Sequence, residues 1–173
     1  MASKNALTSI NAVIAIAVES TAGTRPTTGK AYYKIPQVTA LPDLDFEPDT
    51  IETTSYENAE FKSYLPGLKD TGGLLTLEAN FTDYGVEMWD DIAGDLDVDL
   101  TGKIAWILIT FAGTEKTWFI PVKPVKTGMP DAPVNDKLSI NYNFTVLKDI
   151  VKDTITKTTL ASDYIATSDY VAS

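Results

Sequence analysis

The amino-acid sequence predicts an all-β domain, a β-sandwich or barrel-like sheet with one flanking α-helix. Thr, Tyr, Val and Ile are abundant among its 173 residues, which favours strands over helices. Several segments alternate apolar and polar residues with a period of two, and one segment has the period of a helix. Strands on both sides of a single helix are typical of a sheet with a helix packed on it rather than of repeated βαβ units.

The first half of the chain contains three expected strands and the helix. Residues 14–18 alternate Ile and Val with Ala, residues 32–39 form a second strand, and residues 75–81 alternate Leu, Ala and Phe with polar residues. A helix follows, with apolar side chains recurring every three or four residues from Tyr84 to Leu96. Thr82 or Asp83 can cap its start, and Gly94 can end it.

The second half contains three more expected strands. Residues 104–111 are apolar on both faces, which suits a central strand or one whose outer face meets another subunit. A short hairpin leads to a strand at residues 117–122, and residues 138–146 give the clearest half-buried pattern. Loops are expected at residues 20–30 and 128–136. Three prolines cannot donate to a ladder and should lie at edges, ends or bulges: Pro36, Pro121 and Pro124.

Composition excludes most catalytic machinery. The chain has no Cys and no His, so disulfides, thiolate nucleophiles, imidazole bases and His-ligated metals are absent. Twenty-four Asp and Glu against fourteen Lys and Arg give a formal net charge of -10, which argues against tight binding to nucleic acid or an anionic membrane. The apolar run at residues 12–18 is too short for a membrane span and poorly flanked for a secretion signal, so we expect an intracellular, soluble chain.

Acidic residues concentrate in two windows. Residues 43–60 and residues 83–99 each contain seven, together fourteen of the twenty-four. These windows are either solvated surfaces or acidic faces that line a passage or meet basic patches on a neighbour.

Three patterns imitate functional sites and are discounted. Residues 95–99 begin like a calcium loop, but the sixth position is Leu100 and the twelfth is Trp106. Asp90 and Asp91 could form a glycosidase pair, although such pairs arise by chance in so acidic a chain. The sequons at residues 80 and 143 lie within strand patterns and are expected to be structural. We therefore predict no catalytic residue, no metal site, no cofactor and no enzymatic activity.

Three segments carry a resemblance to a known family. They are Ile35-Pro-Gln-Val, then Leu41-Pro-Asp-Leu-Asp-Phe-Glu-Pro-Asp-Thr-Ile-Glu-Thr-Thr54, then Tyr64-Leu-Pro-Gly-Leu-Lys-Asp-Thr-Gly-Gly-Leu-Leu-Thr-Leu77. Together they resemble the major tail tube proteins of long, non-contractile-tailed (siphovirus-type) bacteriophages. The order of segments matches over roughly residues 10–148, although no single motif is diagnostic.

The resemblance implies a phage tail tube-like fold and a structural role. Residues 1–150 would be the tube β-domain with a long connection at residues 41–70, and residues 151–173 a C-terminal extension or arm. Subunits of this family self-assemble into stacked rings, usually hexameric, that form a hollow tube for DNA ejection. The implied location is the virion tail, after synthesis in the cytoplasm of the bacterial host. The implied partners are other copies of the chain, tape-measure, tail-terminator and distal tail proteins, and double-stranded DNA in transient, non-specific passage, with no membrane.

The connection at residues 41–70 is the candidate interface, because a long Pro-flanked connection is unusual inside a compact domain. We expect it to reach a neighbouring subunit or ring. The candidate interface residues are Asp49, Glu52, Thr53, Thr54, Tyr64, Pro66, Gly67, Lys69 and Asp70.

Two other classes of function stay open on the sequence. One is a monomeric β-sandwich that binds carbohydrate or protein, with Tyr32, Tyr33, Trp106 and Trp118 as an aromatic platform if they are not core residues. The other is a small hydrolase that works through carboxylates alone.

Overall fold

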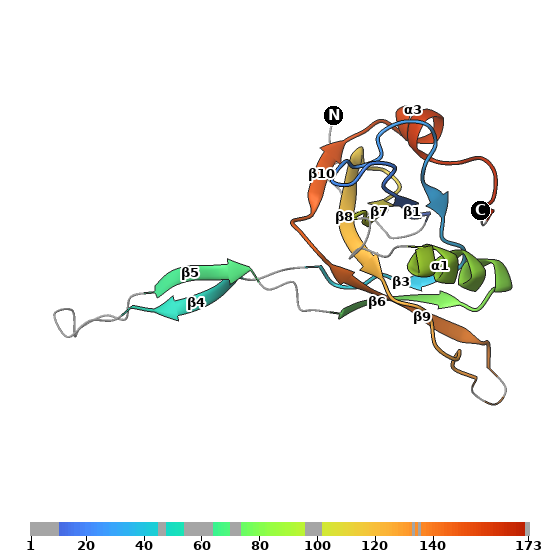
Figure 1. The fold of residues 1–173 in the computed structure, drawn as a ribbon, viewed down its shortest axis with the longest axis horizontal. Helices are drawn as coiled ribbons and strands as arrows, with labels where there is room; N and C mark the ends of the chain where they lie inside the picture. Colours follow the sequence, from blue (N-terminus) through green and yellow to red (C-terminus); the bar gives the residue numbers. More distant parts are fainter. Residues whose placement is uncertain are drawn as a thin grey trace.

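A computed structural model describes residues 11–44, 48–53, 64–69, 74–95, 102–132, 134 and 136–171. The fold is mostly β, with an antiparallel sheet that curls into a half-barrel and one substantial helix beside it (Figure 1). The predicted fold class is therefore confirmed. In the described part of the chain, no helix is long and apolar enough to span a bilayer.

The main sheet has the strand order β2-β1-β7-β8-β9-β6-β3, and β10 pairs with β8 off this path. Its strands are β1 (Val13–Val18), β2 (Tyr33–Lys34), β3 (Val38–Ala40), β6 (Leu74–Asn80), β7 (Ala105–Thr110), β8 (Lys116–Pro124), β9 (Ser139–Val146) and β10 (Val151–Thr154). A separate two-stranded sheet pairs β4 (Pro48–Glu52) with β5 (Tyr64–Lys69). The sequence analysis did not predict β4, β5 or β10.

Prolines fix where strands break, as predicted. The expected strand at residues 32–39 is divided into β2 and β3 because Pro36 has no N–H and Gln37 has a positive φ of 55°. Pro124 ends β8. Pro121 lies inside β8 but opposite the gap between β9 and β10, and its carbonyl accepts a hydrogen bond from Leu147 N at 2.9 Å. A proline at this irregularity interrupts no ladder bond.

Helix α1 (Asp83–Asp95) closes the concave face of the sheet. Thr82 Oγ1 accepts a hydrogen bond from Gly85 N at 3.1 Å and caps the helix as predicted. The side chain of Trp89 is fully buried, with its ring centroid 4.9 Å from that of Tyr142 on β9. Its Nε1 donates to Val125 O at 2.8 Å, so the indole has both apolar contacts and a polar partner. Gly94 lies within the last turn and does not end the helix.

The convex face of β1, β7 and β8 is also buried. Trp106, Leu108 and Phe119 point to this face and pack with Leu160 and Ile165 from the C-terminal segment. Every residue of β7 is consequently buried, which explains its apolar run. The central-strand interpretation is confirmed, and residues of the same chain cover the outer face.

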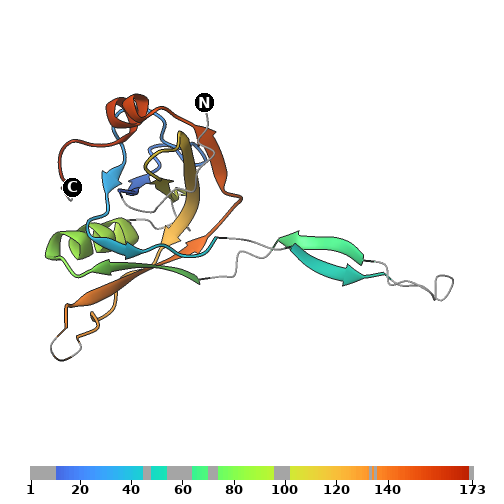
Figure 2. The same cartoon turned by 180° about the vertical axis from the view of Figure 1, so that it is seen from behind.

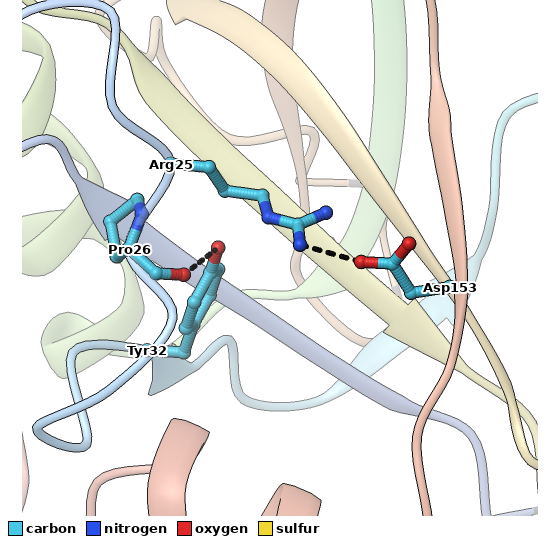
Figure 3. A network of polar contacts seen from close by, with 4 residues as sticks. All are labelled: Arg25, Pro26, Tyr32 and Asp153. Carbon is cyan, nitrogen blue, oxygen red and sulfur yellow. Dashed lines mark hydrogen bonds and ion pairs between the residues drawn. The ribbon is translucent and has the colours of Figure 1, made fainter.

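Residues 151–171 are held on the domain at several points. β10 pairs with β8, and the short helix α3 (Lys157–Thr159) continues into the π-helical turn η1 (Leu160–Tyr164). Asp153 on β10 forms an ion pair with Arg25 (Figure 3). The Arg25 guanidinium also lies 4.1 Å from the ring centroid of Phe119. Tyr32, which donates to Pro26 O at 3.2 Å in the same view, forms a parallel bridge with Ile165. The domain boundary at residue 150 stays a prediction.

A buried carboxylate anchors the loop that follows β1. Glu19 is 2% exposed, and its Oε2 accepts hydrogen bonds from Gly23 N at 2.8 Å and Ile104 N at 3.3 Å. Its Oε1 accepts from Trp106 Nε1 at 2.8 Å. Three donors on one carboxylate satisfy a group that would otherwise be costly to bury.

Gly85, in the first turn of α1, allows the helix to approach Tyr142 on β9 closely. A Cβ at position 85 would lie 2.5 Å from Tyr142 Oη and 2.8 Å from Thr82 Oγ1. We expect Gly85→Ala to lower the free energy of unfolding by about 1–2 kcal/mol in urea titrations, because overpacking outweighs the better helix propensity of Ala. Gly94→Ala is the matched control, since its Cβ meets the flexible end of Lys126 at 3.4 Å. Equal stability of the two variants would contradict the close approach.

The raised pKa of Tyr142 predicts that folding stability depends on pH. Burial of its phenol, with a smaller contribution from the negative charge of Asp90, raises its pKa from 10.0 to about 12. The unfolded chain loses this proton near pH 10 and the folded chain near pH 12, so folding stability due to this group falls as the pH rises through that window. Tyr142→Phe should lose less stability than the wild type between pH 10 and 12, measured by urea unfolding. Parallel pH profiles would contradict the raised pKa. At pH 7 the two should differ by no more than about 1 kcal/mol, because Tyr142 Oη has no hydrogen-bond partner among the described residues.

Candidate subunit interface

The connection at residues 41–70 contains a β-hairpin, made of β4 and β5, that projects from the half-barrel. Figures 1 and 2 show it extending far beyond the body of the domain from either side. In the described part of the chain, its strands pair only with each other. A two-stranded hairpin is at best marginally stable in water without another surface to cover it.

The hairpin presents an apolar pair to solvent. Ile51 on β4 and Leu65 on β5 are directly opposite one another, and their side chains are 57% and 58% exposed. Cross-strand neighbours in an antiparallel pair point to the same face. This apolar pair is therefore a small contact surface that the chain itself leaves open.

A bulge shapes the hairpin at its Pro-Gly sequence. The register shifts between Pro48 and Thr50, so β5 has one more residue than β4 over the stretch that contains Pro66 and Gly67. Both residue types are tolerated at bulges, because Pro cannot complete a ladder and Gly accepts unusual backbone angles. Bulges also discourage unwanted pairing along an exposed edge.

The predicted interface residues divide between the two strands. Asp49 and Glu52 lie on β4, with Thr53 directly after it, and Tyr64, Pro66, Gly67 and Lys69 lie on β5. The register brings Glu52 opposite Tyr64. Thr54 and Asp70 lie outside the described residues. The role of all nine in assembly stays a prediction.

The sequence analysis missed Ile51 and Leu65, the two most exposed apolar side chains described on the hairpin. The sequence held a signal for their exposure, because Ile51 lies between Thr50 and Glu52, and Leu65 lies between Tyr64 and Pro66. An apolar residue among such neighbours is less often part of a core. The sequence analysis chose this segment for its length and its prolines and did not consider its apolar side chains.

A groove of about 560 Å³ lies beside residues 41–44, the described segment that precedes β4. Its apolar lining comes from both ends of the fold: Leu41, Leu44, Ile109, Phe111, Trp118 and Ile150. Lys152 and Asp149 lie at its edge, and the Lys152 ammonium is 5.2 Å from the ring centroid of Trp118. The mostly apolar lining suits contact with an apolar surface better than catalysis.

The carboxylates considered for catalysis or metal binding show no such site among the described residues. Asp90 Oδ1 accepts hydrogen bonds from Thr127 N at 2.8 Å and Thr127 Oγ1 at 2.9 Å, which ties α1 to the segment after β8. Among the residues that the structure describes, no group of three acidic side chains could hold a metal ion. Most of the calcium-like stretch at residues 95–99 lies outside them.

The four aromatic residues proposed as a platform and the sequon at residue 143 belong to the packed domain. Tyr32 and Trp106 are buried in the core, and Tyr33 and Trp118 are half-buried, so these four rings do not form an exposed platform. Asn143 Oδ1 accepts a hydrogen bond from Thr76 Oγ1 at 2.8 Å across the β6–β9 pair, the structural role expected for that sequon.

Comparison with solved structures places the fold. No family model and no curated protein matches the sequence. A chain in the tail of an empty gene transfer agent (GTA) particle, computed with helical refinement in C6 symmetry, aligns with a TM-score of 0.54 over 84% of this chain and 98% of that chain. The chain shares the fold of a phage-like tail component. A chain in the virion of a native GTA particle gives the same TM-score over 86% and 99%. Sequence identity is 12% in both cases, so the likeness is one of fold.

The hairpin should be dispensable for folding but required for association. We expect deletion of residues 49–64 to leave the circular dichroism spectrum of the half-barrel intact, because β4 and β5 belong to a separate sheet. The same deletion should abolish tube formation, scored by electron microscopy. Normal tubes from the deletion variant would refute the assignment of this interface.

Proposed function

We propose that this chain is a self-assembling structural subunit of a phage-type tail tube, in which stacked, hexameric rings form a hollow channel through which DNA is ejected. The observation that carries the proposal is the fold likeness to chains of assembled GTA particles, which spans nearly all of those chains. The resemblance of residues 35–81 to major tail tube proteins points the same way from sequence.

The projecting hairpin supports assembly. Its exposed apolar pair needs a covering surface, and identical subunits supply one at every position of a ring or stack. Contacts between different surfaces on successive copies generate a closed ring when the rotation closes and a filament when it does not. A tube of stacked rings needs both kinds of contact, one that closes each ring and one that repeats along the stack.

The negative net charge of the chain suits a channel through which DNA must pass without binding. Binding to duplex DNA comes mainly from Lys and Arg contacts with phosphates. Six copies at -10 each carry a formal charge of -60, which disfavours such contacts over distances of about a Debye length, roughly 8 Å at physiological salt. An acidic tube would let DNA slide without adhering.

The proposed role is structural and non-enzymatic, and its site of action is the virion tail. Tape-measure, tail-terminator and distal tail proteins would contact the two ends of the tube. The solved structures that share the fold are components of a tail and of a virion.

Negative-stain electron microscopy of the purified chain across a concentration series, with sedimentation velocity in parallel, tests the proposal. We expect six-fold rings or hollow tubes whose proportion rises with concentration, because association of identical subunits follows mass action. A monodisperse monomer at every concentration would refute self-assembly. The alternative function, a monomeric binding module, would then be the better interpretation.

A further inference from the structure

A second protrusion carries exposed apolar side chains. The connection between β8 and β9 ends in a loop on which Met129 is 92% exposed and Val134 is 90% exposed. We call this pair the loop patch. Neither side chain contributes to the apolar cores of the domain.

The base of this loop is fixed to the domain by hydrogen bonds. Val125 N donates to Asn143 O at 2.8 Å, and Thr127 donates twice to Asp90 on α1. Farther out, Asp131 and Ser139 exchange two backbone hydrogen bonds, at 2.9 and 3.2 Å. Two large apolar side chains are thus held in solvent by an ordered base, at the cost of exposing them to water. Such an arrangement indicates a contact surface.

The loop patch and the hairpin lie at opposite ends of the molecule. Figures 1 and 2 show the hairpin extending from one side of the half-barrel along its longest axis, and the β8–β9 connection extending from the other side. A hairpin and a loop placed in this way on one chain are positioned to meet on successive copies rather than within one copy.

We propose that the loop patch of one copy is the docking site for the hairpin of a second copy, with Met129 and Val134 packing against the Ile51–Leu65 pair. The proposal rests on the self-assembly proposed above and names the surface that receives the hairpin. Met suits this contact because its flexible thioether adapts to an irregular surface.

Charges of both signs surround the two surfaces. Exposed Lys126 and Lys137 flank the loop patch along the chain, and exposed Asp131 and Asp136 lie between them, whereas the described hairpin strands carry two acidic residues and one basic residue. Pairing of opposite charges around an apolar centre would set the orientation of the two partners and discourage wrong pairings. Each copy would give its hairpin to one neighbour and its loop patch to another, which is the head-to-tail contact that builds rings and filaments.

The absence of cysteine from the sequence allows a direct test. Ile51→Cys protein and Val134→Cys protein are mixed under assembly conditions, oxidised and separated on a non-reducing gel. A disulfide-linked dimer containing one copy of each variant, in several-fold excess over the homodimers, is the expected result. The matched control replaces Val134→Cys with Val171→Cys, another exposed apolar position at 82%. Equal yields with the control, or homodimers of Ile51→Cys alone, would overturn the proposal.

A second variant separates this proposal from the proposed function. Met129→Asp with Val134→Asp should keep the wild-type circular dichroism spectrum and melting temperature but form no tubes, whereas Val171→Asp should assemble like the wild type. Tubes from the double variant would overturn the docking site and leave the tube function standing. Failure of the wild type itself to assemble would reject the tube function, and the docking site with it.

Discussion

The fold depends on the burial of one helix face against the concave side of a curled sheet. Trp89 is central to this contact, since it packs on Tyr142 and also donates to the backbone at Val125. Large aromatic side chains contribute most to such cores. Because α1 also ties down the segment after β8 through Asp90, the same contact that closes the half-barrel positions the protruding β8–β9 connection.

The other face of the sheet shows why a chain of this size needs its C-terminal segment. β7 is apolar on both sides, and its outer side chains would face water without Leu160 and Ile165. The ion pair between Arg25 and Asp153 lies at the edge of this cover, with the guanidinium stacked on Phe119. The chain itself therefore covers the centre of the sheet on this face.

Sequence patterns were informative where burial is one-sided. The alternation in β6 and β9, the helical period around Trp89 and the prolines at strand breaks were all predicted, because each reflects a local rule. The pairing of β4 with β5 and of β10 with β8 was not predicted, since strands as short as Val151–Thr154 are too short to show a periodic pattern. The loop at residues 128–136 was predicted, but its projection from the domain was not. For the candidate interface, the length of the Pro-flanked connection at residues 41–70 marked a segment that projects from the domain, but exposure of Ile51, Leu65, Met129 and Val134 could be established only in three dimensions.

The separation of the hairpin from the main sheet has a mechanical consequence. Among the described residues, β4 and β5 share no ladder hydrogen bond with the main sheet, so the hairpin and the half-barrel are separate hydrogen-bonded units (Figure 2). A pull on the hairpin could therefore unpair β4 from β5 without breaking a ladder bond of the half-barrel. Under load the two-stranded unit would yield first, and the packed half-barrel would keep its shape.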